Sequence, residues 1–185
     1  QKKLIIKFQD DRGWNNLRTF LSDQDLNHLA KPSGKEITLN VDCVPCYEHF
    51  NCYVDVLNDI GRSNILNSIN LRGDMVLETW RMLKKSLEIN TNIGKLQISD
   101  TTSDAVCGLF KIWGEHPHTL SANANAGLKI NTLSFENLKI TDAAVFGSVL
   151  RDMVAKMPNL AVIDFSQTTL SGQQKEVLSF QLEPL

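Results

Sequence analysis

Residues 130–140 read Ile130-Asn-Thr-Leu133-Ser-Phe135-Glu-Asn-Leu138-Lys-Ile140, and the reading of the whole chain begins from this segment. Its apolar residues stand at relative positions 1, 4, 6, 9 and 11. Leu133 and Phe135 are two residues apart, so they share one face of a short strand and point into a core. Leu138 and Ile140 then turn the chain towards a helix. One such unit cannot bury its apolar face alone, so the pattern is expected to recur.

The same spacing does recur along the chain. It is found in residues 160–170, 93–101 and 66–76, with looser copies in residues 37–44 and 4–8. The fourth positions of the copies are separated by 33, 30, 27, 37 and 30 residues, and these positions are Ile6, Leu39, Ile69, Leu96, Leu133 and Ile163. The interval of 37 residues requires an insertion, which we place in the Gly-, Asn-, Pro- and Ser-containing segment 114–127.

This recurrence resembles the leucine-rich repeat, whose signature is L-x-x-L-x-L-x-x-N/C-x-L. A strand and a full helix in about 28 to 30 residues resemble the ribonuclease-inhibitor-like subtype. The resemblance implies an α/β right-handed solenoid, or horseshoe, of about five to six repeats with a parallel sheet on its concave face. It covers residues 36–170 well and residues 1–35 weakly. The ninth position departs from the usual Asn or Cys, because it is Val44, Asp74, Thr101, Leu138 and Thr168.

Length and composition indicate one globular domain. The chain has 185 residues, of which 42% are hydrophobic and 22% charged, and its net charge of −2 implies no general attraction to nucleic acid or to a membrane. No apolar run is long enough to cross a bilayer. We expect an N-terminal repeat or cap in residues 1–35, repeats in 36–170 and a C-terminal cap or truncated repeat in 171–185. The chain begins with Gln1, which we interpret as a sign of a fragment of a longer protein.

The apolar spacing also predicts the helices. They are expected from about residue 14, over residues 45–60 and 74–87, from an N-cap at Ser103 or Asp104, and from residue 141 to 157. In the helix over residues 74–87, Trp80 is predicted to lie in the core, whereas Arg81, Lys84 and Lys85 are predicted to face water.

A cluster of four metal-binding residue types has the spacing Cys43-x-x-Cys46-x-x-His49-x-x-Cys52. Thiolates and an imidazole could hold zinc. The predicted helix from residue 45 argues against a shared site. It places Cys46 and His49 on one face, but Cys52 lies further round the helix and Cys43 precedes the turn. Zinc fingers also put a dozen or more residues between ligand pairs. We therefore expect Cys43 and Cys46 to occupy apolar turn positions and His49 or Cys52 to be part-exposed, in a reducing cytoplasm, with no metal and no cofactor.

Catalytic signatures are absent from the sequence, which contains no G-x-S-x-G, no H-E-x-x-H and no G-x-x-x-x-G-K-[ST]. His116 and His118 fall in the predicted insertion, where a protein contact is favoured over catalysis because no fixed carboxylate accompanies them. The string Arg72-Gly73-Asp74 falls on a strand-to-turn step and not on the exposed loop that an integrin-type motif needs. The sequence therefore predicts a protein that is not an enzyme.

Binding is predicted on the concave strand face. Between the buried residues of each strand, the intervening side chains point outwards, and the set is polar and slightly acidic: Asn40, Asp42, Asn70, Arg72, Gln97, Ser99, Asp100, Ser134, Glu136, Asn137, Asp164 and Ser166. A basic or polar protein surface is the expected partner. Of the aromatic and arginine anchors that interfaces favour, only Arg72 is present in this set.

The resemblance implies a function in protein–protein interaction. The first expectation is a cytoplasmic ligand-sensing or autoinhibitory domain of an innate immune receptor, bound to another protein or to another domain of its own chain, with neither nucleic acid nor membrane as partner. Two alternatives stay open, namely an effector of an intracellular bacterium that binds a host protein, and a GTPase-regulating domain that uses Arg72.

Overall fold

The computed structural model of the chain describes residues 4–8, 37–42, 67–74, 80, 81, 84, 87, 93–114 and 129–183, and for 4–8 and 37–42 it describes the backbone alone. The expected helices from residue 14 and over residues 45–60 lie outside these residues, as do Cys43, Cys46, His49 and Cys52.

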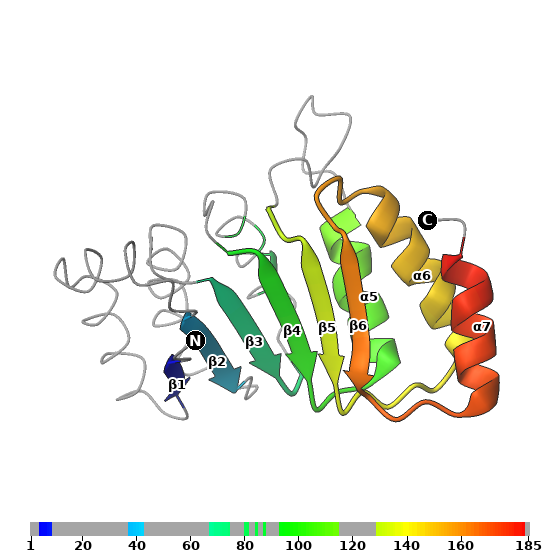
Figure 1. The fold of residues 1–185 in the computed structure, drawn as a ribbon, viewed down its shortest axis with the longest axis horizontal. Helices are drawn as coiled ribbons and strands as arrows, with labels where there is room; N and C mark the ends of the chain where they lie inside the picture. Colours follow the sequence, from blue (N-terminus) through cyan, green and yellow to red (C-terminus); the bar gives the residue numbers. More distant parts are fainter. Residues whose placement is uncertain are drawn as a thin grey trace, which may run out of the picture.

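Six strands form one sheet whose spatial order follows the sequence, and every neighbouring pair is parallel. The strands are β1 (Leu4–Phe8), β2 (Ile37–Asp42), β3 (Ser68–Arg72), β4 (Lys95–Ser99), β5 (Thr132–Glu136) and β6 (Val162–Gln167). Figure 1 shows them side by side from the N-terminal to the C-terminal end of the molecule. The expected α/β class with a parallel sheet is thereby confirmed.

The register of the sheet follows the repeat predicted from sequence. The fourth positions of successive copies are direct partners, so that Ile6, Leu39, Ile69, Leu96, Leu133 and Ile163 form one row across all six strands. A slip of one residue would turn each strand's apolar side chains to the other face, so burial of one face sets this register.

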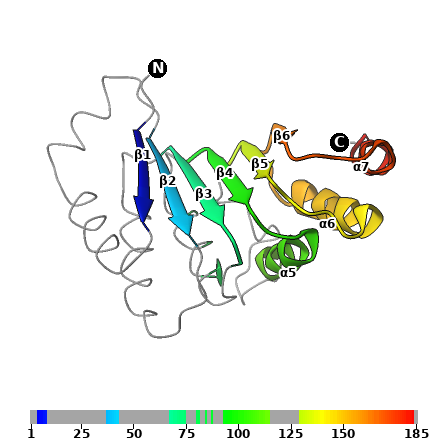
Figure 2. The same cartoon turned by 90° about the horizontal axis from the view of Figure 1, so that it is seen from below.

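Within residues 93–114 and 129–183, three helices lie on one side of the sheet, and Figure 2 shows them in a row beside the strands. They are α5 (Ser103–Gly114), α6 (Ala143–Ala155) and α7 (Gly172–Leu182). Each begins at a polar cap, because Thr102 Oγ1 accepts the amide of Ala105, Asp142 accepts the amide of Val145, and Ser171 forms a capping box with Gln174. For α5 the predicted caps, Ser103 and Asp104, were wrong by one or two residues, since the side chain of Thr102 takes that role.

The core lies between the sheet and the helices. Trp80 and Trp113 stack with ring centroids 4.3 Å apart, and each indole N–H donates to a backbone carbonyl, of Leu109 and of Trp80 respectively. Phe135 of β5 has no exposed surface and contacts three other phenylalanines, which are Phe110, Phe146 and Phe165. Aromatic packing therefore joins the strand layer to the helix layer.

The helix predicted over residues 74–87 is described at four positions, which are all helical: 80, 81, 84 and 87. Trp80 is fully buried as predicted, and Arg81 is exposed as predicted. The prediction for Lys84 was wrong, because its side chain is only 7% exposed. A lysine can be buried to this extent because its aliphatic stem is apolar.

The turns after the strands repeat one backbone conformation. Gly73, Asp100 and Asn137 each follow a strand, and their φ angles of 84°, 54° and 48° are left-handed. Their amides donate to Ser99, Glu136 and Gln167 in the next strand along the sheet. Glycine, Asp and Asn are the residues that adopt this conformation most readily. The turns are therefore superposable units joined by a ladder of backbone hydrogen bonds.

Candidate binding surface on the sheet

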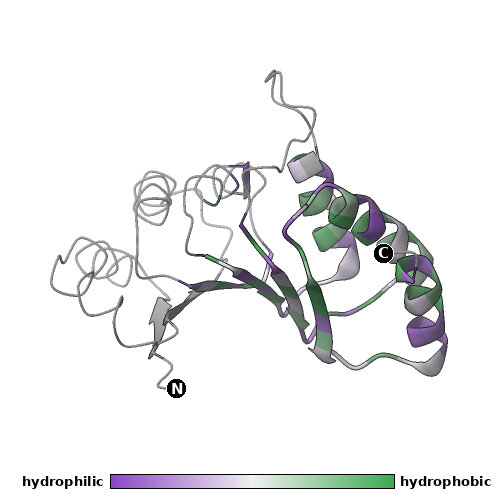
Figure 3. Cartoon of the chain, turned by 45° about the horizontal axis from the view of Figure 1, so that its top comes forward, coloured by the Kyte–Doolittle hydropathy of each residue, from purple (hydrophilic) through white to green (hydrophobic). Residues whose placement is uncertain are grey.

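The sheet presents a second face, opposite to the one that α5, α6 and α7 cover, and we call it the strand face. Its side chains form cross-strand rows. The first row contains Asn40, Asn70, Gln97, Ser134 and Asp164, and the second contains Asp42, Arg72, Ser99, Glu136 and Gln167. The sequence therefore identified residues that the fold does bring together. In Figure 3, hydrophilic and hydrophobic residues alternate along β3 to β6, as a sheet with one apolar and one polar face requires.

The second row departs from simple alternation at its end. The register between β5 and β6 shifts between Ser134 and Glu136, so Glu136 pairs with Gln167 and not with Ser166. A bulge inserts one extra residue into a strand and bends it. Gln167 therefore stands beside Glu136, although the set of outward-facing residues identified from the sequence included Ser166 and not Gln167.

A network of hydrogen bonds holds the middle of the strand face. Ser99 Oγ donates to Asn70 Oδ1 at 2.7 Å, and Gln97 Nε2 donates to Glu136 Oε2 at 2.5 Å. Ser99 also lies 3.4 Å from the same carboxylate oxygen of Glu136. Because a hydrogen bond to a charged acceptor is stronger than one between neutral groups, Glu136 is the centre that orients its neighbours.

A second network lies at the C-terminal ends of β3, β4 and β5. Asp100 accepts from Arg72 Nε and Nη2 at 3.1 and 2.9 Å through one oxygen, and from Asn137 Nδ2 at 2.8 Å through the other. The Arg72 and Asp100 side chains keep 41% and 39% of their surface exposed. The hydrogen bonds from Asn137 and Arg72, with the charge of Arg72, lower the pKa of Asp100, so this carboxylate stays ionised.

Asp164 is the last residue of the first row and lies on β6. It has partners of its own. Ser166 donates its amide to Asp164 Oδ1 at 2.8 Å. Hydrogen bonding from Ser166, aided by the positive charge of Lys95, lowers the pKa of Asp164. Asp164 is therefore a stable negative charge on β6, the last strand of the sheet.

Not every predicted residue can touch a partner directly. Asn70, Ser99 and Ser134 are only 8%, 2% and 3% exposed, so a partner can reach little of their surface. Gln97, Glu136 and Asp164 are half-buried, whereas Asp100, Asn137 and Ser166 are exposed. The backbone pairing places Asn40 and Asp42 in the two rows, and for these two residues the structure describes the backbone alone. His116 and His118 lie outside the described residues.

A third row, at the N-terminal ends of the strands, was missed in the sequence analysis. It contains Ser68, Lys95, Thr132 and Val162, of which Val162 is 50% exposed. Lys95 precedes Gln97 by two residues, so the alternation that identified Gln97 also identifies Lys95. The row adds a positive charge and an apolar contact to the strand face.

The charged side chains of the Arg72-Gly73-Asp74 string are bonded within the fold. Arg72 pairs with Asp100, and Thr101 Oγ1 donates to Asp74 Oδ1 at 2.6 Å. Both charged ends of the string thus have partners in the next turn of the chain, which agrees with reading it as part of the strand-to-turn step.

Within the described part of the chain, no group of three or more His, Cys, Asp or Glu residues could hold a metal ion. Nor does any helix of these residues have the length and apolarity that a membrane span needs. When the sequence is compared with models of known protein families and with curated proteins, nothing matches. Function must therefore be argued from the fold and the strand face themselves.

Proposed function

We propose that this chain is a leucine-rich-repeat domain of the ribonuclease-inhibitor-like subtype and acts as a protein-binding module without enzymatic activity. The observation that carries the proposal is the row of repeat positions, Ile6 to Ile163, in which every copy of the sequence pattern pairs in register with the next. Such stacking builds an extended surface from many short units, and repeat proteins use such surfaces for binding.

The turns support the repeat assignment. The left-handed backbone at Gly73, Asp100 and Asn137 recurs at the same step of three successive copies. At the ninth position of the last copy, Thr168 Oγ1 donates to the carbonyl of Phe135 at 2.9 Å and lies 3.4 Å from the amide of Leu138. A short polar side chain at this position thus bonds the neighbouring turn, which is the task the resemblance implies for Asn or Cys.

The strand face supports the binding role. Its exposed charges are ordered by neighbours before any partner arrives, and binding to such a surface costs less conformational entropy. The charge of Arg72 offsets that of Asp100, and Lys95 lies close enough to Asp164 to affect its pKa. Glu136 is then the remaining charge among these residues, so the described part of the face is slightly acidic. A basic or polar protein surface is the partner that this balance favours.

Among parent proteins, we favour a cytoplasmic innate immune receptor in which this domain senses a ligand or holds the receptor inactive. This rests on the resemblance of the repeats. A bacterial effector that binds a host protein shares the same support. A GTPase-regulating role is less favoured, because it needs an arginine aimed at a nucleotide, and Arg72 instead donates two hydrogen bonds to Asp100. Sequencing the full-length transcript tests the parent, since the receptor requires a nucleotide-binding domain in the same chain.

Charge reversal tests the binding surface. Partners captured from cytosol by the wild-type chain, and identified by mass spectrometry, are compared with those captured by Asp164→Lys. We expect the variant to lose a specific partner, because a basic surface is repelled by the new lysine. Glu176→Lys on α7 is the matched control, since Glu176 is an exposed acid on the helix layer. Equal capture by all three proteins would remove the strand face as the binding site.

A further inference from the structure

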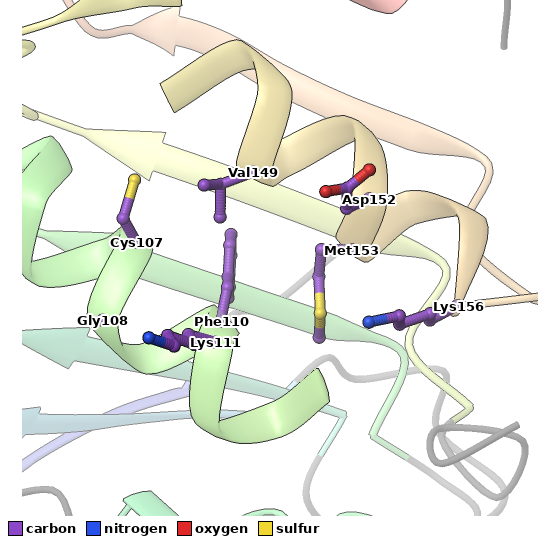
Figure 4. A pocket seen from close by; sticks show the side chains of 8 residues that line it. All are labelled: Cys107, Gly108, Phe110, Lys111, Val149, Asp152, Met153 and Lys156. Atoms are coloured by element: carbon purple, nitrogen blue, oxygen red, sulfur yellow. The ribbon is translucent and has the colours of Figure 1, made fainter. Parts of the chain in front are cut away.

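A pocket of ≈ 420 Å³ lies between α5 and α6 on the helix side of the molecule, far from the rows of the strand face. Figure 4 shows the two helices in front of the strands, with the lining side chains between them. Small-molecule sites occupy about 300 to 1,000 Å³, so this volume suits a small ligand.

The inner surface of the pocket is apolar. Phe110 of α5 and Met153 of α6 are 3% and 2% exposed, and Val149 is half-buried beside them. Burial raises the pKa of the Cys107 thiol, and the nearby charges of Asp104 and Asp142 act in the same direction, so this lining residue stays neutral. The accessible apolar surface is that of Val149 and Cys107, and an apolar group of a ligand would lie against these two residues.

A glycine without a packing role opens the pocket. Gly108 lies in the middle of α5, where glycine disfavours a helix, and a Cβ atom added to it would meet nothing within 4 Å. Gly147 of α6 is the contrast, because its Cβ would come within 3.0 Å of Gln181 on α7. Contact between helices thus explains Gly147 but not Gly108. The missing side chain at Gly108 leaves room for an occupant.

The charged lining is positive on balance. Lys111 and Lys156 contribute two ammonium groups, and Asp152 is the one acid among the lining residues. In Figure 4 the side chain of Lys156 extends towards Met153, and both residues line the pocket. A cation beside an apolar surface is suited to a ligand that carries both an anionic and an apolar part.

We propose that the pocket between α5 and α6 binds a small amphipathic carboxylate. The apolar part lies on the partly exposed Cys107 and Val149, above the buried Phe110 and Met153, and the carboxylate pairs with Lys156 or Lys111. Gly108 admits the ligand between the helices. This site is independent of the strand face, so either can fail without the other.

Sodium octanoate serves as the probe, titrated into the isotopically labelled 185-residue chain and followed by amide NMR. We expect saturable shifts confined to α5 and α6. Acetate supplies the charge without the apolar part, and 1-octanol the apolar part without the charge, so both are expected to bind at least about tenfold more weakly, since each loses one class of contact. No saturation by octanoate, or equal binding of acetate or octanol, overturns the proposal. If the groove between α5 and α6 is instead a docking site for a partner protein, we expect no saturable octanoate binding, and this result also overturns the proposal.

Two sets of variants locate the binding. Gly108→Leu fills the opening and should weaken octanoate binding at least tenfold, whereas Gly172→Leu, at a position where a Cβ also meets nothing, should leave it unchanged. Lys111→Gln with Lys156→Gln should weaken binding similarly, with Lys175→Gln on α7 as the control. The lysine variants keep the test decisive if Gly108→Leu fails to fold. Unchanged affinity in folded variants of the pocket overturns the proposal.

Discussion

The middle of the sheet and its C-terminal end are built from the same sequence pattern but differ in how well they are buried. In β3, β4 and β5 the repeat positions Ile69, Leu96 and Leu133 are at most 1% exposed. In β6 the equivalent Ile163 is only half-buried, and so is Phe165. The difference arises from position, because an inner repeat has a neighbour on each side and the last described one has a neighbour on one side only.

The helices show the same contrast. Helix α6 buries Phe146, Gly147, Leu150 and Met153, whereas α7 buries Leu178 alone. Stacking therefore supplies burial that the pattern within one repeat cannot supply. An inner side chain should therefore contribute more to the free energy of unfolding than its counterpart at the C-terminal end of the sheet. Substitutions at equivalent positions can test this.

The largest effect is expected for Phe135→Ala. Phe135 is fully buried and packs on Phe110, Phe146 and Phe165, so its loss leaves a cavity that should reduce the free energy of unfolding by about 3 to 5 kcal/mol. Urea unfolding followed by circular dichroism measures it. Phe165→Ala is the matched variant in the half-buried end strand and should cost clearly less. Equal losses at both positions would mean that the two regions are packed alike.

An intermediate effect is expected for Thr168→Val. The Thr168 hydroxyl donates to the buried carbonyl of Phe135, and its removal leaves that oxygen without this donor. We expect a loss of about 1 to 3 kcal/mol in urea unfolding. Thr101→Val is the control in the middle of the sheet, because Thr101 donates to Asp74, which is exposed and can turn to water instead. A larger loss at Thr101 would contradict the role given to Thr168.

The sequence was sufficient to predict the strands and their register. The spacing of two between residues such as Leu133 and Phe135 predicts a strand. Copies of the pattern at intervals of about thirty residues can bury their apolar sides only by stacking in parallel. The exposed face of each strand followed from the same alternation. These features depend on local periodicity, which a single sequence displays.

What the sequence did not predict depends on three-dimensional neighbours. The register shift between Ser134 and Glu136 places Gln167, and not Ser166, beside Glu136, and alternation alone carries no signal for it. Burial of Lys84 depends on what packs against its stem. Partner choice is equally non-local, since Asp100 is joined to Arg72 and Asn137 across two interstrand steps. Which polar residues of the strand face stay exposed could thus be decided only from the structure.

A smaller effect on the free energy of unfolding is expected from the network of Asp100, Arg72 and Asn137 at the C-terminal ends of β3, β4 and β5. Because the folded-state pKa of Asp100 lies below its unfolded value, the ionised carboxylate stabilises the fold above the unfolded pKa, near 3.8. That stability is lost as the pH falls through the folded pKa. The pair is partly exposed, so we expect less than about 1 kcal/mol. Urea unfolding of wild type and Asp100→Asn near neutral pH and near pH 3 should show the gap between them narrowing in acid. A constant gap would contradict the role of the ionised carboxylate.

The smallest effect is expected for Phe180→Ser at the C-terminal end. Val177, Leu178, Phe180 and Leu182 make this segment apolar, but Leu178 and Phe180 are two residues apart and so point to nearly opposite sides of α7. Leu178 is 3% exposed and Phe180 76% exposed. A substitution that removes only exposed surface should change the free energy of unfolding by less than about 0.5 kcal/mol. Leu178→Ala, measured in the same way, should be clearly destabilising. If Phe180→Ser destabilised the chain as much as Leu178→Ala does, Phe180 would have to be covered in solution, and the contrast between the end and the middle of the sheet would narrow.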